Sequence, residues 1–103
     1  MVLLFLTMIP LDKGPSFSPY VARVLDIIDK SGLEYAINPM GTVIEGEYDE
    51  VMALVGKCFE ALREDSERIS ITMKIDYRKG DSSRLKSKIE KVESVLGRTI
   101  KKS

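Results

Sequence analysis

The stretch NPMGTVIEGE, residues 38–47, places a turn between two runs of residues that are typical of strands. Before the turn, Tyr35 and Ile37 alternate with smaller or polar residues, and Val43 continues an alternation after it. Pro39 fixes its own φ and lacks a backbone N–H, while Gly41 can adopt a positive φ at little cost. We therefore predict a β-hairpin here, and the helical patterns on both sides of it decide the rest of the fold.

Length and composition limit the classes of protein to consider. The 103 residues suit a single domain, residues 1–103, with one modest core. Sixteen basic and sixteen acidic residues cancel, so no overall field favours nucleic acid or an anionic membrane. No apolar run approaches the roughly 18 residues that cross a bilayer, and the N-terminus lacks the pattern of a signal peptide. We expect a cytoplasmic protein that binds neither nucleic acid nor membrane.

Two absences bear on chemistry and origin. Histidine is missing, which removes the commonest general base and the commonest metal ligand, and one cysteine cannot form an internal disulfide. Glutamine is also missing, Asn38 is the sole asparagine, and 31% of the residues are charged. Scarce amides and abundant charges are typical of thermophilic proteins. We expect no metal, no cofactor and a thermophilic source.

The N-terminal third predicts a central strand followed by a helix. Residues 2–9 are apolar except for Thr7, so both faces of this strand need cover, one from helices and the other from a partner subunit. Ser18 before Pro19 is typical of a helix N-cap, and Gly32 is placed to end that helix in the left-handed conformation. The helix, ending near Lys30, carries an apolar stripe of Val21, Val24, Leu25 and Ile28.

The remainder predicts a helix, a strand and a further helix. Asp49 is a plausible cap for the second helix, which ends near Glu64. Residues 68–78 alternate strictly and predict a half-buried strand. The third helix carries Leu85, Ile89, Val92 and Leu96 and ends at Gly97. The apolar stripe of the second helix is Val51, Leu54, Val55, Cys58, Phe59 and Leu62, and that of the strand is Ile69, Ile71, Met73, Ile75 and Tyr77.

The order strand, helix, strand, strand, helix, strand and added helix defines the fold class. The first six elements match the ferredoxin-like βαββαβ unit, an α+β fold with an antiparallel sheet and both crossover helices on one face. The doubly apolar first strand fits the central position that this topology gives it. The C-terminal helix is an addition to the unit.

Four segments of the sequence resemble those of a known family: SPYVA (18–22), SGLEY (31–35), PMGTVIEGE (39–47) and KIDYR (74–78). The chain resembles, over nearly its whole length, the small thiamine-binding proteins of the UPF0045 or DUF77 group. The resemblance implies a ferredoxin-like fold, a homotetramer built as a dimer of dimers, and binding of thiamine or its pyrimidine moiety without catalysis. The loop LDKGPSFS (11–18) is a part in which the family varies.

Five residues are candidate ligand contacts, and each has a plainer alternative. The Asn38 amide can pair with both edges of an aminopyrimidine, or it can be an ordinary residue before a turn proline. Thr7 and Thr42 can offer hydroxyls to a pocket, or they can be ordinary strand threonines. If the hairpin walls a pocket, we expect Thr7, Asn38 and Thr42 to converge on one face of the sheet.

Charge and helix capping give the other two candidates. Glu45 can attract a cationic ring such as thiazolium, whereas Glu47 is better placed to favour the start of the following helix. Ser18 is a helix cap first and a ligand contact second. Cys58 lies on an apolar helix stripe, so we interpret it as a buried hydrophobic residue and expect no catalysis.

Two other functions remain as alternatives to ligand binding. One is a structural or regulatory homo-oligomer without a small-molecule ligand, which shares the same fold and apolar surface. The other is RNA binding, because the RRM has the same element order and stacks bases on exposed sheet aromatics. Phe5 is the only plausible stacking residue here, so RNA binding is the weaker alternative.

Overall fold

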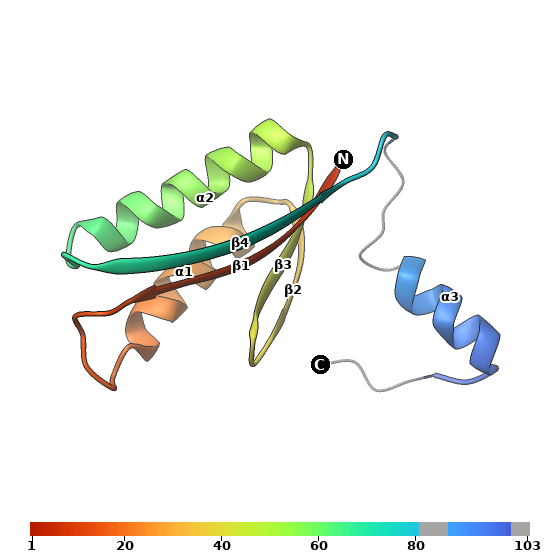
Figure 1. The fold of residues 1–103 in the computed structure, drawn as a ribbon, viewed down its shortest axis with the longest axis horizontal. Coiled ribbons are helices and arrows are strands. Elements are labelled where there is room, and N and C mark those ends of the chain that lie inside the picture. Colours follow the sequence, from red (N-terminus) through yellow and green to blue (C-terminus); the bar gives the residue numbers. More distant parts are fainter. Residues whose placement is uncertain (81–86, 100–103) are drawn as a thin grey trace.

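The computed structural model describes the backbone of residues 1–80 and 87–99, and the side chains of residues 1–80 and 90–99. Four strands form one antiparallel sheet in the order β2-β3-β1-β4. The first two helices cover one face of this sheet, and α3 lies apart from it (Figure 1). The elements are β1 (Val2–Pro10), α1 (Ser18–Lys30), β2 (Glu34–Asn38), β3 (Gly41–Gly46), α2 (Tyr48–Arg63), β4 (Ile69–Tyr77) and α3 (Ser87–Leu96). The predicted ferredoxin-like α+β fold with an added C-terminal helix is confirmed.

The central strand β1 divides the structure into two faces. Its alternate residues Val2, Leu4, Leu6 and Met8 are buried against the helices, whereas the residues between them are only partly buried. Directly paired residues share a face in an antiparallel sheet, so the register assigns every strand residue to the helix face or to the open face. The core on the helix face is completed by Val24, Ile28, Ile44, Val51, Leu54, Val55, Cys58 and Leu62.

The hairpin forms where it was predicted, but Gly41 has a different role. Asn38 pairs with Gly41, which leaves Pro39 and Met40 as a two-residue loop. Gly41 does not adopt a positive φ, so that prediction is wrong. Instead, a Cβ at Gly41 would lie 2.6 Å from Cε2 of Phe5 and 3.0 Å from the carbonyl oxygen of Leu6. Gly41 is required because the Phe5 ring occupies the space of a side chain.

The helices cover the predicted residues but do not begin as predicted. The N-cap of α1 is Phe17 and that of α2 is Glu47, and neither makes a side-chain capping hydrogen bond. Ser18 and Asp49 therefore lie inside their helices, and both predicted caps are wrong. The acidic Asp49 still favours the first turn of α2 through the helix dipole. Gly32, with a φ of 81°, follows α1 in the predicted left-handed conformation.

Strand β4 has the predicted alternation but less burial. Its apolar residues pair with the buried residues of β1, as in Ile75 with Leu4 and Met73 with Leu6, so they lie on the helix face. The helices do not reach far enough to cover this edge strand, and the stripe from Ile71 to Tyr77 is exposed. Tyr77 has 67% of its surface exposed. The prediction of a half-buried strand is therefore wrong beyond Ser70.

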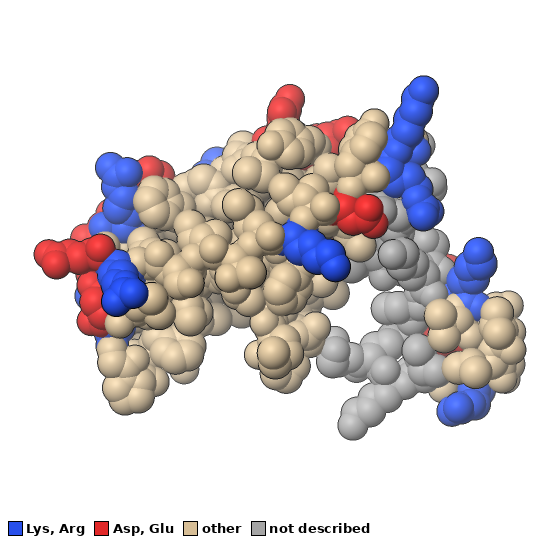
Figure 2. Space-filling model, viewed as in Figure 1, with Lys and Arg blue, Asp and Glu red and all other residues tan. Residues whose placement is uncertain are grey.

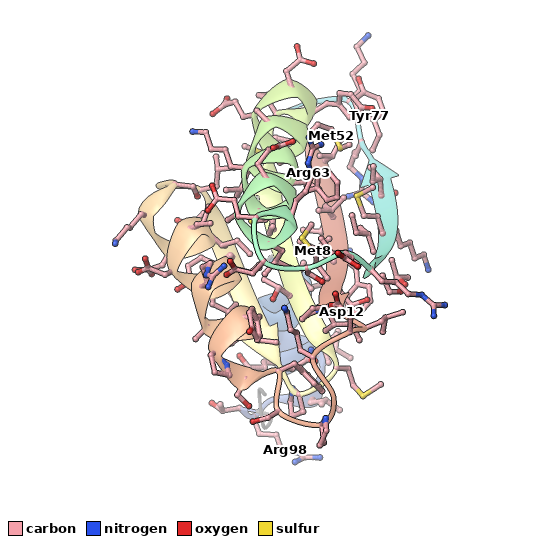
Figure 3. The ribbon with its side chains drawn as sticks, turned by 90° about the vertical axis from the view of Figure 1, so that its left-hand side faces the viewer. Met8, Asp12, Met52, Arg63, Tyr77 and Arg98 are labelled. Atoms are coloured by element: carbon pink, nitrogen blue, oxygen red, sulfur yellow. The ribbon has the colours of Figure 1, made fainter. Side chains whose placement is uncertain are left out.

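Two loops join at the end of the sheet where β1 finishes. The backbone N–H of Leu11 donates to the carbonyl of Arg68, and the carboxylate of Asp12 accepts hydrogen bonds from Ser66 Oγ and from the backbone N–H of Glu67. These bonds lower the pKa of the Asp12 carboxyl from 3.8, the Ser66 hydroxyl first and the Glu67 N–H second. Figure 3 shows Tyr77 near the top of the view and Asp12 well below it, with the Met8 label at a height between them.

Helix α3 ends as predicted, at Gly97, whose φ is 71° and whose N–H donates to the carbonyl of Glu93 at 2.8 Å. Val92, Val95 and Leu96 are exposed. Leu85 and the side chain of Ile89, which belong to the predicted stripe, lie outside the described residues. No helix in the described part of the chain is long and apolar enough to cross a membrane.

Candidate functional site

A pocket of about 210 Å³ lies where the hairpin ends beside β1. The last pair between β1 and β3 joins Leu6 to Thr42, whereas β1 continues to pair with β4 as far as Pro10. On the hairpin side, β3 therefore stops three to four residues before β1 does. The pocket occupies this notch, with Thr7, Met8 and Ile9 on the β1 side and Pro39, Gly41 and Thr42 on the hairpin side.

Helix α1 supplies the opposite wall of the pocket. Phe17, Val21, Val24 and Leu25 recur at the three- and four-residue spacing of one helix face, and all four line the pocket. From the sequence we placed Val21 and Leu25 on the apolar stripe of this helix, and the structure leaves both only partly buried. An apolar stripe that packs on a core and one that walls a pocket follow the same pattern, so no sequence signal distinguished them.

The Asn38 side chain is committed to the turn. Its Oδ1 accepts hydrogen bonds from the backbone N–H of Met40 at 2.7 Å and of Gly41 at 3.2 Å. An amide with its oxygen fixed in this way can still donate two hydrogen bonds through Nδ2. Asn38 also lines the pocket. It can therefore offer donors to a ligand, but the oxygen predicted to accept from an aminopyrimidine already serves the turn.

Thr7 and Thr42 both line the pocket but come from opposite faces of the sheet. Thr42 pairs with the buried Leu6 and with Ile37, which places it on the helix face, where it is 8% exposed. Thr7 and Asn38 alternate with those residues and lie on the open face. The predicted convergence on one sheet face is wrong for Thr42. The three meet because the pocket opens at the end of the hairpin, where both faces are accessible.

The other two candidates do not line this pocket. Glu45 lies three residues further along β3 than Thr42, ~10 Å away at ~3.3 Å per strand residue. It is 3% exposed and lies on the open face, between its pairing partners Leu3 and Glu34. Ser18 is exposed at the start of α1, one residue beyond the lining residue Phe17. The structure thus gathers Thr7, Asn38 and Thr42 and leaves Glu45 and Ser18 outside.

The lining residues provide hydrogen-bonding groups and apolar surface without charge. The thirteen described residues around the pocket include no acidic or basic side chain. Their polar side chains are the two threonine hydroxyls and the Asn38 amide, and backbone groups at the strand ends add donors and acceptors. A few fixed polar groups in a mainly apolar wall are typical of a small-molecule site.

Cys58 confirms its predicted role as a buried hydrophobic residue. It has no exposed surface, and its Sγ lies 4.0 Å from the carbonyl oxygen of Val24. Burial raises the pKa of its thiol to about 11, so the nucleophilic thiolate is scarce at neutral pH. Among the described residues, no three His, Cys, Asp or Glu side chains are grouped so that they could hold a metal ion.

A ferredoxin-like α+β domain with a small uncharged pocket at the end of its hairpin is the class of protein that this geometry defines. Comparison with known families identifies the class more closely. The thiamine-binding protein family matches residues 4–93, most of the chain. The chain belongs to this family.

Relatives of similar length support the assignment. The chain is 38% identical over 94 residues to a UPF0045 protein of Methanothermobacter thermautotrophicus, which covers 88% of this chain and 95% of that protein. It is 33% identical over 86 residues to a UPF0045 protein of Methanocaldococcus jannaschii, with 84% and 86% covered. The predicted resemblance to the UPF0045 or DUF77 group is confirmed.

Solved structures share the fold. A hypothetical protein of M. jannaschii superposes with a TM-score of 0.80 at 32% identity, over 88% of this chain and 94% of that chain. A Thermotoga maritima protein, whose name proposes a role in thiamine biosynthesis or salvage, gives a TM-score of 0.77 at 24% identity, over 88% and 97%. The second likeness shows the fold alone.

Proposed function

We propose that this protein binds a small molecule with an aminopyrimidine ring, either thiamine or its pyrimidine half, and performs no chemistry on it. The observation that carries the proposal is the pocket in which Thr7, Asn38 and Thr42 meet at the end of the hairpin. An aminopyrimidine presents a donor beside ring acceptors, which hydroxyls, an amide N–H and backbone groups can satisfy. The family name and the name of the T. maritima relative agree with this ligand class.

The size of the pocket favours one ring over a larger ligand. Sites for drug-sized molecules enclose about 300–1,000 Å³, and this pocket holds about 210 Å³. A single pyrimidine ring suits that space, whereas a two-ring ligand would extend through the mouth. Phe17 and Ile37, both partly exposed, line the pocket and provide apolar contact surface.

The absence of catalysis is supported by the groups within reach. The pocket residues that the structure describes offer threonine hydroxyls without an adjacent base that would activate them. The Cys58 thiol is buried in the core and holds its proton at neutral pH. A ligand in this pocket is therefore held and released unchanged.

Self-association is the second part of the proposal. The helix-face stripe of β4, defined as Ile71, Met73, Ile75 and Tyr77, is exposed, and large exposed apolar patches mark interaction surfaces. Figure 2 shows that uncharged atoms dominate the middle of the viewed face, with many charges toward the ends of the body. We propose a cytoplasmic homotetramer, a dimer of dimers, in which this stripe is covered by another subunit.

Isothermal titration with thiamine tests the binding proposal, and thermal unfolding with the same ligand supports it independently. Binding to the native state raises the melting temperature as ligand concentration exceeds the dissociation constant. We expect saturable heat and a higher melting temperature. Neither heat nor protection at millimolar thiamine, and none with the pyrimidine half, would reject the proposal.

A structural oligomer without a ligand is the alternative, and the exposed β4 stripe is the observation that favours it. A tetramer that binds none of these ligands would establish this alternative. RNA binding receives less support, because the Phe5 ring lies against Gly41 and is only partly exposed. Such a ring is poorly placed to stack on a base.

A further inference from the structure

A strap, residues 11–16, joins β1 to α1 and rests on the turn between α2 and β4, residues 64–68. The backbone N–H of Leu11 donates to the carbonyl of Arg68 at 2.8 Å. The Asp12 carboxylate accepts from the backbone N–H of Glu67 at 2.7 Å, across 55 positions of sequence. The strap is therefore held in place by contacts with a distant segment.

Ser66 in this turn has two alternative hydrogen-bond acceptors. The residue is buried, and its Oγ lies within hydrogen-bonding distance of the Asp12 carboxylate and, at 3.1 Å, of the carbonyl oxygen of Arg68. A serine hydroxyl has one proton, so it donates to one of them at a time. The charged carboxylate is the stronger acceptor while the strap rests on the turn. When Asp12 moves away, the hydroxyl can donate to Arg68 and is not left unpaired in a buried position.

The strap has the features of a segment that opens while the rest of the domain stays folded. Its residues are exposed, apart from the half-buried Lys13, whose Nζ donates to the carbonyl of Asp65. Gly14 has a φ of 63°, and Pro15 after it lacks a backbone N–H. Segments with exposed hydrogen bonds and few buried apolar contacts open at a lower free energy than the whole domain. Water can replace the hydrogen bonds of the strap when it lifts.

The strap leads directly into one wall of the pocket. Phe17 follows it, forms the N-cap of α1 and lines the pocket. Because α1 begins without a side-chain capping hydrogen bond, its first turn depends on the strap for support. Further along, Arg23 fixes the helix by an ion pair with Asp65 at 2.7 Å and a hydrogen bond to the carbonyl of Ala61 at 3.1 Å. Opening of the strap therefore loosens Phe17 and leaves α1 in place from Arg23 onward.

We propose that the strap opens and closes as a unit while the domain stays folded, and that Ser66 changes its acceptor from Asp12 to Arg68 when the strap opens. Because Phe17 moves with the strap, this opening controls how fast a molecule enters and leaves the pocket. The control of entry rests on the proposed function, whereas the opening itself does not. Asp12 and Ser66 are positioning residues, which act through Phe17 and do not touch the ligand.

Hydrogen exchange on the unmodified protein tests the opening. The amides of Leu11 and Glu67 donate in opposite directions across the junction, so a strap that opens as a unit exposes both at once. We expect their protection factors to agree within about threefold and to lie at least about a hundredfold below those of Leu4 and Leu6, which pair on both sides in the centre of β1. Protection of Leu11 and Glu67 equal to that of Leu4 would show that the strap opens only on unfolding, and would overturn the proposal.

Three variants test the hydrogen bonds that hold the strap. Asp12→Ala removes the acceptor of two of them and should lower the protection of the Leu11 amide at least about tenfold. In that variant Ser66 donates to Arg68 whether the strap is open or closed, so adding Ser66→Ala should change the protection by less than about threefold. Fully additive effects would overturn the exchange of acceptors. Lys30→Met, which breaks an exposed ion pair elsewhere on α1, is the control and should leave the protection unchanged.

Surface plasmon resonance with thiamine tests the control of entry. A strap that opens more often admits and releases the ligand more often, so Asp12→Ala should raise the association and dissociation rates together, at least about fivefold, and keep Kd within about threefold. Faster dissociation alone would show that Asp12 only supports the pocket wall, and would overturn the control of entry, as would unchanged rates.

Failure of the proposed function has a different result. If neither thiamine nor its pyrimidine half binds, the proposed function is rejected and the control of entry with it, while hydrogen exchange still decides whether the strap opens. If Asp12→Ala does not fold, the exchange rates of the unmodified protein still support or overturn the opening.

Discussion

The ring of Phe5 lies so close to the α-carbon of Gly41 that a Cβ there would stand 2.6 Å from Cε2 and 2.7 Å from Cζ. The two residues occupy the open face of adjacent strands, beside the pocket. The contact explains why the hairpin needs glycine at a position whose φ any residue could adopt.

We predict that Gly41→Ala lowers the free energy of unfolding by about 1–3 kcal/mol, because the Phe5 ring must shift within a packed surface. Gly56→Ala is the control, since a Cβ at Gly56 meets nothing within 4 Å. Replacing a glycine inside a helix should stabilise the protein by about 0.5–1 kcal/mol. Urea unfolding measures both. Equal effects of the two substitutions would contradict the close contact, and Phe5→Leu should reduce the cost of Gly41→Ala.

Asn38 is predicted to have separable roles in folding and in binding. Asn38→Ala removes the acceptor for two turn N–H groups and should cost about 0.5–2 kcal/mol of stability. Asn38→Asp retains both acceptor interactions but replaces the Nδ2 donor with a negative charge. Thermal unfolding should therefore find Asn38→Asp close to the unmodified protein, while calorimetry finds its ligand binding reduced. An Asn38→Asp variant that binds normally would show that the amide does not contact the ligand.

Asp12 should contribute to the dependence of the free energy of unfolding on pH in the acidic range. Its hydrogen bonds with Ser66 and Glu67 lower the pKa of the folded carboxyl below 3.8. A lowered pKa in the folded state stabilises the protein above the unfolded pKa, and the contribution disappears as the pH falls through the folded pKa. Asp12→Asn should therefore be less stable than the unmodified protein at neutral pH, and the difference should shrink below about pH 4. A difference that stays constant with pH would contradict this role.

Cys58 provides a probe of whether the second helix opens in the folded protein. Because the thiol has no exposed surface and a pKa of about 11, it should resist alkylation in the folded protein and react at once in denaturant. Cys58→Ala should keep ligand binding and assembly while losing about 1 kcal/mol of stability, since it removes a buried sulfur atom. Rapid alkylation of the native protein would show that the second helix does not seal this position.

Oligomer formation should depend on the β4 stripe. Light scattering on the unmodified protein should report four times 11.6 kDa. Ile75→Glu places a charge in the exposed stripe and should yield smaller species, because burying that carboxylate without a partner is costly. Ala22→Glu, on the exposed side of α1, is the control and should leave the assembly unchanged. A monomer of the unmodified protein at micromolar concentration would reject the proposal.

Local sequence patterns predicted the helices and strands well, because apolar residues recur with a different period in a helix than in a strand. The alternation around Tyr35 and Ile37 and the proline at position 39 located the hairpin, and the glycines at positions 32 and 97 marked two helix ends. The two predicted helix caps were wrong because the position of a cap depends on the backbone angles of the residue before the helix. The identities of Ser18 and Asp49 do not determine those angles. The role of Gly41 depends on a contact with Phe5, 36 positions earlier, which no local window contains.

The candidate site was only partly predictable, for a geometric reason. Asn38 pairs with Gly41 across the turn, so Thr42, one residue further, must lie on the other face of the sheet. Once a two-residue loop is assumed, the sequence alone tells which residues of the hairpin lie on the same face of the sheet. The position of the pocket, however, also depends on where β3 stops along β1. That register is set by packing between distant segments. For the same reason, the spacing that predicted an apolar stripe with Val21 and Leu25 could not show that both residues also line a pocket.

The pairing of β1 with β4 also governs the order of folding. The hairpin joins neighbours in sequence, whereas Val2 pairs with Tyr77 across 75 positions. Contacts between distant segments carry a larger loop-closure entropy and form later. During synthesis, β1 leaves the ribosome before β4, so one edge of β1 has no strand to pair with until β4 has been translated. The doubly apolar β1 is thus the segment that a chaperone has most reason to shield.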